Sequence, residues 1–140
     1  MATIRPFAAD DRRPVIAVWE RSGITRPWND PGRDIDRKLA IDPDGFLVAE
    51  HDGVVVGTVM AGYDGHRGWI NYLAVDPDAQ RFGVGRALMA AAETLLGERG
   101  CPKINLQIRT SNREAIGFYE SIGYTLDDVV SMGRRLVDDD

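Results

Sequence analysis

Two glycines separated by one residue lie where a run of apolar residues ends and a helix is predicted to begin. Gly83 and Gly85 have no side chain that would keep an anion away from the main chain, and they permit positive φ angles. The start of a helix adds N–H groups without intrahelical partners and the positive end of the helix dipole. Arg81 and Arg86 place two cationic side chains beside this turn. The combination favours the binding of a phosphate or diphosphate group.

Two common nucleotide-binding motifs do not fit this turn. A Rossmann turn needs a third small residue at position 88, where this chain has Leu88. A Walker turn needs Gly-Lys followed by Ser or Thr, which occurs nowhere in the chain. The alternative to a phosphate site is a tight connection between a strand and a helix that binds no ligand.

A second pair of polar residues lies on the last predicted helix. Asn112 and Tyr119 are seven residues apart, which is two helical turns, so both side chains lie on one face. A phenol with a pKa near 10 stays protonated at neutral pH and can give its proton to a leaving group. Tyr119 is therefore the candidate general acid. The alternatives are a core aromatic residue for Tyr119 and a helix-end residue without a ligand for Asn112.

Both segments resemble signatures of the GNAT superfamily of acyl-CoA N-acyltransferases. Gln80-x-x-Gly83-x-Gly85 resembles its Q/R-x-x-G-x-G/A signature, and residues 112–124 resemble N-x-x-A-x-x-F/L-Y-x-x-x-G-F/Y at every specified position. The resemblance covers essentially all of residues 4–137. Within the superfamily, the chain resembles the YpeA-type bacterial predicted acetyltransferases and, more loosely, the ribosomal-protein N-terminal acetyltransferases.

The resemblance implies direct transfer of an acetyl group from acetyl-CoA (coenzyme A) to a primary amine on a small molecule or peptide. It also implies that the fourth and fifth strands splay apart to admit the pantetheine arm. Main-chain N–H groups of the fourth strand would hold that arm and the oxyanion. The residues implied to bind the cofactor are Leu73, Ala74, Val75, Gln80, Arg81, Phe82, Gly83, Val84, Gly85, Arg86, Asn112 and Tyr119.

The general base is not defined by this resemblance. Ribosomal-protein N-terminal acetyltransferases have a glutamate where this chain has Gln107, and histone-type members have one that aligns with Trp69. Gln107 can align a water at the substrate site, but an amide does not accept the proton. The remaining candidates are Asp64 and His66, or a water chain to Glu50. His66 is alternatively an ordinary exposed turn residue.

The acceptor end of the cleft is expected beneath the loop of residues 26–31. Trp28 and Tyr63 could wall an amine pocket, and Asp30 or Asp64 could balance the charge of the amine. In the alternative interpretation, Asp30 belongs to the cap of the second helix and Trp28 fills the core.

The expected fold class is α/β (α+β): one GNAT domain over residues 1–140, with four helices and a mixed, twisted sheet of six to seven strands. Asp52-Gly53 predicts a hairpin, and Ser111 with Glu114 predicts a capping box. A frayed tail is expected over residues 138–140. The predicted helices are 10–21, 34–41, 86–96 and 112–123, and the predicted strands are 3–7, 46–50, 54–60, 69–75, 103–108, 124–126 and 129–137.

Composition limits the function classes. A net charge of −5 and a pI near 5.0 argue against a general nucleic-acid surface. The single cysteine, Cys101, excludes an internal disulfide and suits a reducing compartment, and no run approaches the length of a membrane span. The N-terminus shows no signal-peptide pattern. We therefore expect a cytoplasmic protein without a membrane or nucleic-acid partner and without a metal site. The oligomeric state is left open, with a homodimer as one alternative.

Two other functions remain open from the sequence. The missing glutamates are compatible with an acyl-CoA-binding sensor that has no turnover. An acyltransferase that uses a longer acyl-CoA is the other alternative. Cys101 is expected at the far end of the fifth strand from the cleft, which argues against a covalent acyl-enzyme.

Overall fold

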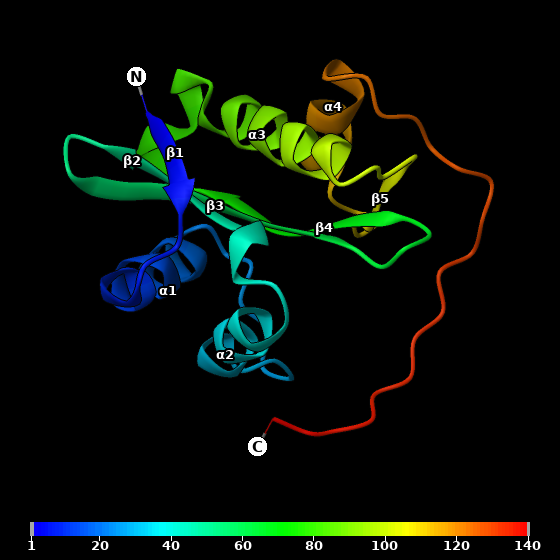
Figure 1. The fold of residues 1–140 in the computed structure, drawn as a ribbon, viewed down its shortest axis with the longest axis horizontal. Coiled ribbons are helices and arrows are strands. Elements are labelled where there is room, and N and C mark those ends of the chain that lie inside the picture. The colour runs from blue at the N-terminus through cyan, green and yellow to red at the C-terminus, as the bar shows by residue number, and fades with distance from the viewer. Residues whose placement is uncertain (1, 140) are drawn as a thin grey trace.

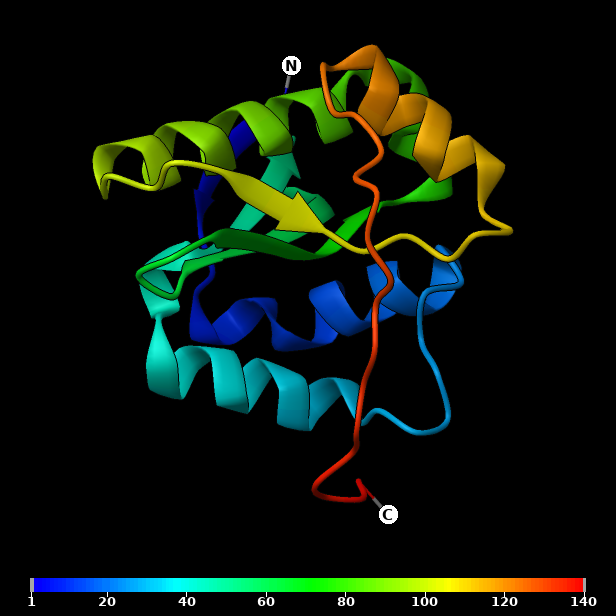
Figure 2. The same cartoon turned by 90° about the vertical axis from the view of Figure 1, so that its right-hand side faces the viewer.

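The chain folds around one five-stranded sheet, and the computed structural model describes residues 2–139 of it. Helices α1 and α2 cover one face of the sheet, and α3 and α4 lie on the other (Figures 1 and 2). The strand order is β1-β2-β3-β4-β5, with β4 and β5 parallel and the other neighbours antiparallel. The elements are β1 (Thr3–Pro6), α1 (Arg12–Arg21), α2 (Pro31–Ile41), β2 (Phe46–His51), β3 (Val54–Tyr63), β4 (Gly68–Val75), α3 (Val84–Glu98), β5 (Ile104–Leu106) and α4 (Arg113–Ser121).

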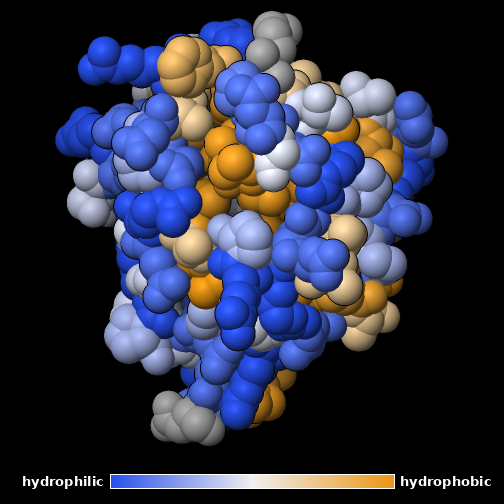
Figure 3. Space-filling model, turned by 90° about the vertical axis from the view of Figure 1, so that its left-hand side faces the viewer, coloured by the Kyte–Doolittle hydropathy of each residue, from blue (hydrophilic) through white to orange (hydrophobic). Residues whose placement is uncertain are grey.

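Alternating side chains of the central strands belong to two hydrophobic cores, one on each face of the sheet. On one face, Leu47, Val59 and Ile70 pack with Leu88 and Leu96 of α3. On the other face, a second set of buried residues joins the strands to α1 and α2; it comprises Val15, Val18, Trp19, Ile35, Phe46, Val48, Val55, Met60 and Ala74. The two-residue period of the strands therefore separates the layers. The outer face at the hairpin side is a mixture of hydrophilic side chains and smaller apolar areas (Figure 3).

The β2–β3 hairpin forms as the sequence predicts. Asp52 and Gly53 both have positive φ angles, of 50° and 77°, as a two-residue turn of the primed class requires. The crossover through α3 then places β5 parallel to β4, which is also as predicted.

Pairing between β4 and β5 is short. It joins Gly68, Trp69 and Ile70 to Ile104, Asn105 and Leu106, whereas β4 continues to Val75. The two strands therefore diverge beyond Ile70, which confirms the expected splay.

The predicted sixth and seventh strands are wrong. Residues 124–126 and 129–137 contain no strand, so the described sheet has five strands rather than six to seven. This segment is held to the chain around β5 by side-chain contacts and not by strand pairing. Gln107 donates to Ser131, and Lys103 pairs with Asp127 at 2.7 Å. Figure 2 shows the segment descending from α4, across the end of β5, toward α2.

The last described residues also differ from the frayed tail expected from the sequence. The Asp139 carboxylate pairs with Arg37 at 2.6 Å and accepts a hydrogen bond from the N–H of Asp30 at 2.7 Å. Asp140 lies outside the described residues.

Two predicted helix starts are corrected. Helix α2 begins at Pro31 rather than Asp34, because the Asp30 side chain caps it by accepting from the N–H of Arg33 at 3.1 Å. Helix α4 is capped by Asn112 rather than by a Ser111–Glu114 box, since Asn112 Oδ1 accepts from the N–H of Ala115 at 3.1 Å.

Asp11 fixes the connection from β1 to α1, and its loss should destabilise the fold. Its carboxylate accepts from both Arg5 Nη atoms at 2.7 and 2.9 Å and from the Ala8 N–H at 2.8 Å. The Arg5 hydrogen bonds hold the pKa of Asp11 below its usual 3.8. We expect Asp11→Asn to lower the free energy of unfolding at pH 7 by about 1–3 kcal/mol in urea denaturation.

The loss of unfolding free energy expected for Asp11→Asn becomes smaller as the pH falls. Because the folded-state pKa is depressed, the stabilisation by Asp11 is complete above the unfolded value of about 3.8 and disappears as pH falls through the folded value. The difference between wild type and Asp11→Asn should therefore shrink toward pH 2. Asp10→Asn, at an exposed neighbouring carboxylate, is the matched control. Equal losses in the two variants would contradict this role for Asp11.

Candidate active site

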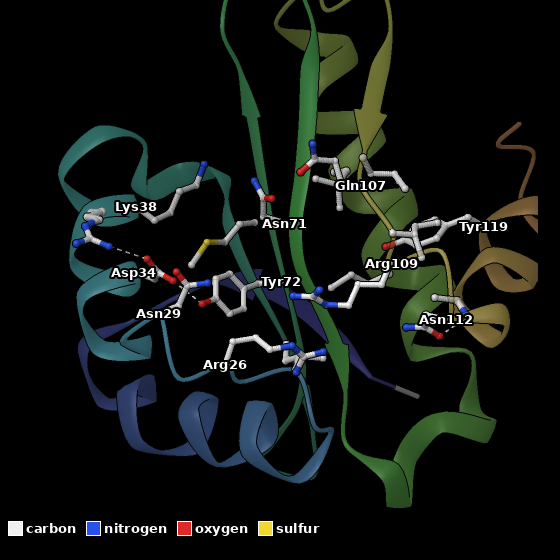
Figure 4. A pocket seen from close by; sticks show the side chains of 18 of the residues that line it. Arg26, Asn29, Asp34, Lys38, Asn71, Tyr72, Gln107, Arg109, Asn112 and Tyr119 are labelled. Carbon is white, nitrogen blue, oxygen red and sulfur yellow. Dashed lines mark hydrogen bonds and ion pairs between the residues drawn. The ribbon is translucent and has the colours of Figure 1, made fainter. Parts of the chain in front are cut away.

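A cleft of about 650 Å³ opens where β4 and β5 separate (Figure 4). One wall comes from β4, the opposite wall comes from the chain after β5 and from α4, and the loop after α1 and helix α2 close one end. The lining residues are Ile24, Arg26, Asn29, Asp34, Arg37, Lys38, Ile41, Met60, Ile70, Asn71, Tyr72, Leu73, Leu106, Gln107, Ile108, Arg109, Asn112, Ala115 and Tyr119.

Tyr119 lies on the α4 wall of this cleft, as the sequence predicts. The ring makes edge contacts with Phe118 and Tyr124, at centroid distances of 5.2 and 5.7 Å. Burial raises the pKa of Tyr119 to about 12. The phenol is therefore a neutral proton donor throughout the physiological range.

Asn112 reaches the same cleft and also caps α4. Its Oδ1 is used by the Ala115 N–H, so its side-chain NH₂ group is the part available to a ligand. The spacing prediction that put Asn112 and Tyr119 on one face is confirmed by their common cleft.

A bulge on β4 shapes the opposite wall. Thr58 pairs with Ala74 and Met60 with Asn71, so β4 carries one extra residue over this interval. Tyr72, inside the bulge, has a φ of 52°, which is unusual for a residue with a bulky side chain. The bulge precedes Leu73, Ala74 and Val75, the segment expected to offer main-chain N–H groups. Leu73 lines the cleft, whereas the Ala74 side chain is buried toward α1.

Three core contacts hold Tyr72 in this conformation. Its ring stacks on Trp19 at a centroid distance of 4.0 Å. Thr58 Oγ1 accepts from Trp19 Nε1 and donates to the Tyr72 carbonyl, both at 2.8 Å. Because Trp19 and Thr58 are fully buried, the bulge is anchored in the core rather than at the surface.

The Tyr72 hydroxyl donates a hydrogen bond to Asp34 of α2, a pair that sequence reasoning missed. Burial, together with the bond to Asp34, raises the pKa of Tyr72 well above its usual value of 10. Arg37 also pairs with Asp34, at 3.0 Å. Asp34 is the one carboxylate among the lining residues that the structure describes. The sequence features that could have indicated the Tyr72–Asp34 pair were a tyrosine within the fourth strand and an acidic residue on the second helix.

The glycine turn precedes α3 as predicted, with a short 3-10 helix at Pro77–Phe82 before it. Gly83 has a φ of 71° and is the N-cap of α3, and no side chain caps the first N–H groups of this helix. Nothing lies within 4 Å of a Cβ built on Gly83, whereas a Cβ on Gly85 would meet the Phe118 ring at 3.3 Å. Gly85 therefore also permits the close approach of α3 and α4.

The other residues of this segment surround the turn. Gln80 Nε2 donates to the Val75 carbonyl at 3.4 Å, and Val84 is buried. Arg81, Phe82 and Arg86 are exposed.

Asp64 and His66, the predicted base candidates, lie outside the cleft lining. Both belong to the β3–β4 turn, at the end of β4 that is paired with β5. Asp64 Oδ1 accepts from the N–H groups of His66 and Arg67 at 2.8 Å each, and these bonds lower the Asp64 pKa. Asp64 therefore stabilises its own turn, and neither Asp64 nor His66 is placed at the cleft.

Tyr63 and Glu50 are also away from the cleft. The Tyr63 hydroxyl donates to the Gly65 carbonyl at 3.3 Å, so it completes the same turn. Glu50 pairs with Arg5 of β1 at the opposite edge of the sheet.

The predicted acceptor loop is only partly at the cleft. Asp30 caps α2, which is the alternative interpretation, and is absent from the lining. Trp28 is 47% exposed and neither fills the core nor lines the cleft; its ring packs against Arg109, at 5.5 Å from the guanidinium carbon. Gln107 does line the cleft, and its amide is bonded to Ser131.

Known proteins are similar to this chain in sequence and in fold. The model of the acetyltransferase (GNAT) family matches residues 13–124. The chain belongs to the GNAT family. This confirms both the family resemblance and the expected fold class. An acetyltransferase of Pectobacterium atrosepticum is 52% identical over 136 residues, which cover 97% of this chain and 96% of the relative.

Solved GNAT structures agree with the fold. Ard1 from Thermoplasma volcanium has a TM-score of 0.77 at 30% identity, over 90% of this chain and 84% of that one. The ribosomal-protein-S18-alanine N-acetyltransferase from Escherichia coli has a TM-score of 0.73 at 26% identity, over 88% and 77% of the two chains. Within residues 2–139, no helix has the length and apolar character needed to cross a membrane.

The raised pKa of Tyr119 gives a direct spectroscopic prediction. With tyrosine Cζ labelled by ¹³C, the Tyr119 signal should remain that of the neutral phenol through pH 10, because its pKa lies near 12. The signal is assigned by its loss in Tyr119→Phe. A midpoint near the unperturbed value of about 10 would contradict the buried, neutral phenol.

Proposed function

We propose that this GNAT protein transfers an acetyl group from acetyl-CoA directly to a primary amine. The observation that carries the proposal is the divergence of β4 and β5 beside the partly buried Tyr119 side chain. Membership of the GNAT family supports the reaction class.

The turn before α3 fits the diphosphate of coenzyme A. Gly83 is in the left-handed region, and the first N–H groups of the 15-residue helix α3 have no side-chain cap. Arg81 and Arg86 are exposed beside them. Helix N–H groups, a positive dipole end and two guanidinium groups together favour a doubly charged anion.

Tyr119 is the proposed general acid. Acetyl-CoA supplies the acetyl group as a thioester. The amine nitrogen forms its bond to the carbonyl carbon, and as the C–S bond breaks, Tyr119 Oη gives its proton to the departing sulfur. Its pKa near 12 keeps the proton on the oxygen until that moment. The nitrogen then loses its second proton, which restores the Tyr119 phenol, so the products are the amide and the free thiol. Main-chain N–H groups at Leu73 to Val75 are the proposed donors to the carbonyl oxygen, and one such donor is typically worth about 3 kcal/mol.

Asp34 replaces Asp64 and His66 as the proposed proton acceptor. It lies at the acceptor end of the cleft, and the Tyr72 hydroxyl and Arg37 orient its carboxylate. A carboxylate there can hold the ammonium form of the acceptor and take the proton that the nitrogen must lose before it attacks.

Release of free thiol tests the function. The protein is mixed with acetyl-CoA and a panel of primary amines, and the thiol is detected chemically. Acetyl-dependent thiol release with at least one amine supports the proposal. Thermal stabilisation by acetyl-CoA without release from any amine would contradict turnover and favour the sensor alternative. Parallel assays with succinyl-CoA and longer acyl-CoA identify the acyl group.

Tyr119→Phe should lower turnover by about 10² or more and leave the dissociation constant of coenzyme A nearly unchanged. The variant removes only the donated proton and keeps the ring. Tyr63→Phe is the matched control, because that hydroxyl bonds only within the β3–β4 turn. A normal rate in Tyr119→Phe would remove the residue from its proposed role.

Gly83→Val should abolish measurable coenzyme A binding, and Gly83→Ala should weaken it at least tenfold. A φ of 71° is strained for any side chain with a Cβ and most for a branched one, so the turn that aims the N–H groups must change. Gly97→Ala is the control on the same helix, since a Cβ there meets nothing within 4 Å and its φ is not positive. Calorimetric binding equal to wild type in both Gly83 variants would refute the phosphate site.

A further inference from the structure

Two cations in the cleft have no carboxylate partner among the described residues. Arg109 packs its guanidinium against the Trp28 ring, and Arg26 donates to the carbonyls of Gly23 and Thr25 at 2.9 Å each. Neither side chain forms an ion pair within residues 2–139, although the chain has a net charge of −5. Both nevertheless line the cleft.

Asp34 supplies a carboxylate at the opposite side of the cleft. Arg37 pairs with both Asp34 and Asp139, so two carboxylates share one guanidinium there. Lys38, the remaining cation of the lining, pairs with Asp42 at 3.3 Å and donates to the Ala61 carbonyl at 2.6 Å, and is thus already satisfied.

The Tyr72 side chain separates these two regions. Figure 4 shows Arg109 extending from the β5 side toward Tyr72, with the end of Arg26 on the same side. Asp34 lies beyond the Tyr72 hydroxyl, on α2. The cleft therefore offers a carboxylate at one side and two guanidinium groups at the other.

We propose that the acceptor is a free α-amino acid, whose carboxylate binds Arg109 and Arg26 and whose ammonium group faces Asp34. The inference rests on the proposed function and names its substrate class. Guanidinium groups bind carboxylates through paired hydrogen bonds, and the guanidinium carbon of Arg109 lies 5.5 Å from the centre of the Trp28 ring. A polyamine or an aminoglycoside would bring further positive charge against these two arginines.

The test uses sets of three amines that share a side chain: the amino acid, its carboxamide and the amine that remains after removal of the carboxylate. Phenylalanine, phenylalaninamide and phenethylamine form one set, and alanine, serine, glutamate and lysine give others. Thiol release from acetyl-CoA is measured for each, together with thermal stabilisation of the protein–coenzyme A complex by each amine alone. We expect kcat/KM for at least one amino acid to exceed that for its carboxamide tenfold or more.

Substitution of Arg109 identifies the residue responsible. Arg109→Gln should lower kcat/KM for the amino acid by about 10- to 100-fold, leave that for the carboxamide unchanged, and leave the dissociation constant of coenzyme A unchanged. Arg13→Gln, at an exposed arginine of α1, is the charge-matched control and should change none of these values.

Three results would overturn the inference: carboxamides or decarboxylated amines that react as well as the acids, an equal loss for acid and carboxamide in Arg109→Gln, or weaker coenzyme A binding in that variant. Failure of the proposed function is seen separately as the absence of thiol release from every amine. In that event, thermal stabilisation of the protein–coenzyme A complex still tests the carboxylate site. Greater stabilisation by amino acids than by their carboxamides supports the site, and equal stabilisation overturns it.

Discussion

The ladder between β4 and β5 ends after three residue pairs, at Ile70 and Leu106, and the cleft exists because it ends there. Two structural features keep the strands apart. The bulge at Tyr72 redirects β4, and the buried Trp19–Thr58–Tyr72 contacts make that bulge part of the core. On the other side, Gly85 lets Phe118 and hence α4 approach α3, which carries Tyr119 to the edge of the gap. An unpaired strand interior leaves main-chain groups free for a ligand.

The same divergence separates the chemical tasks of the site. Helix α3 begins beyond the end of β4 and presents its uncapped N–H groups there, Tyr119 stands at the α4 wall, and Asp34 stands across the cleft on α2. Each group is held by a different element. Because α2 is packed against the sheet through buried Ile35 and held to the last described residues through Arg37 and Asp139, the α2 end of the cleft is built by parts of the chain more than a hundred residues apart.

The sequence was sufficient for several features with a local signal. Asp52-Gly53 predicted the hairpin, the glycine turn predicted that a helix follows it, and the seven-residue interval predicted that Asn112 and Tyr119 share a cleft. It was insufficient where tertiary contacts decide. Asp64 and His66 have suitable chemistry, but the paired end of β4 keeps them away, whereas Asp34 meets Tyr72 only after the sheet and α2 have packed.

The absent sixth and seventh strands have the same cause. The β-branched pair Val129-Val130 suggested a strand, yet propensity for strand structure depends on a partner. Residues 125–139 find side-chain partners in Gln107, Lys103, Asn29 and Arg37 instead of a backbone ladder.

A crystal structure of the protein with coenzyme A bound tests the central claim most directly. The pantetheine arm should lie between β4 and β5, the diphosphate at the first turn of α3, and the thiol sulfur within hydrogen-bonding distance of the Tyr119 hydroxyl. Coenzyme A bound elsewhere, or β4 and β5 paired along their whole length with the Tyr119 hydroxyl turned away from the sulfur, would contradict it.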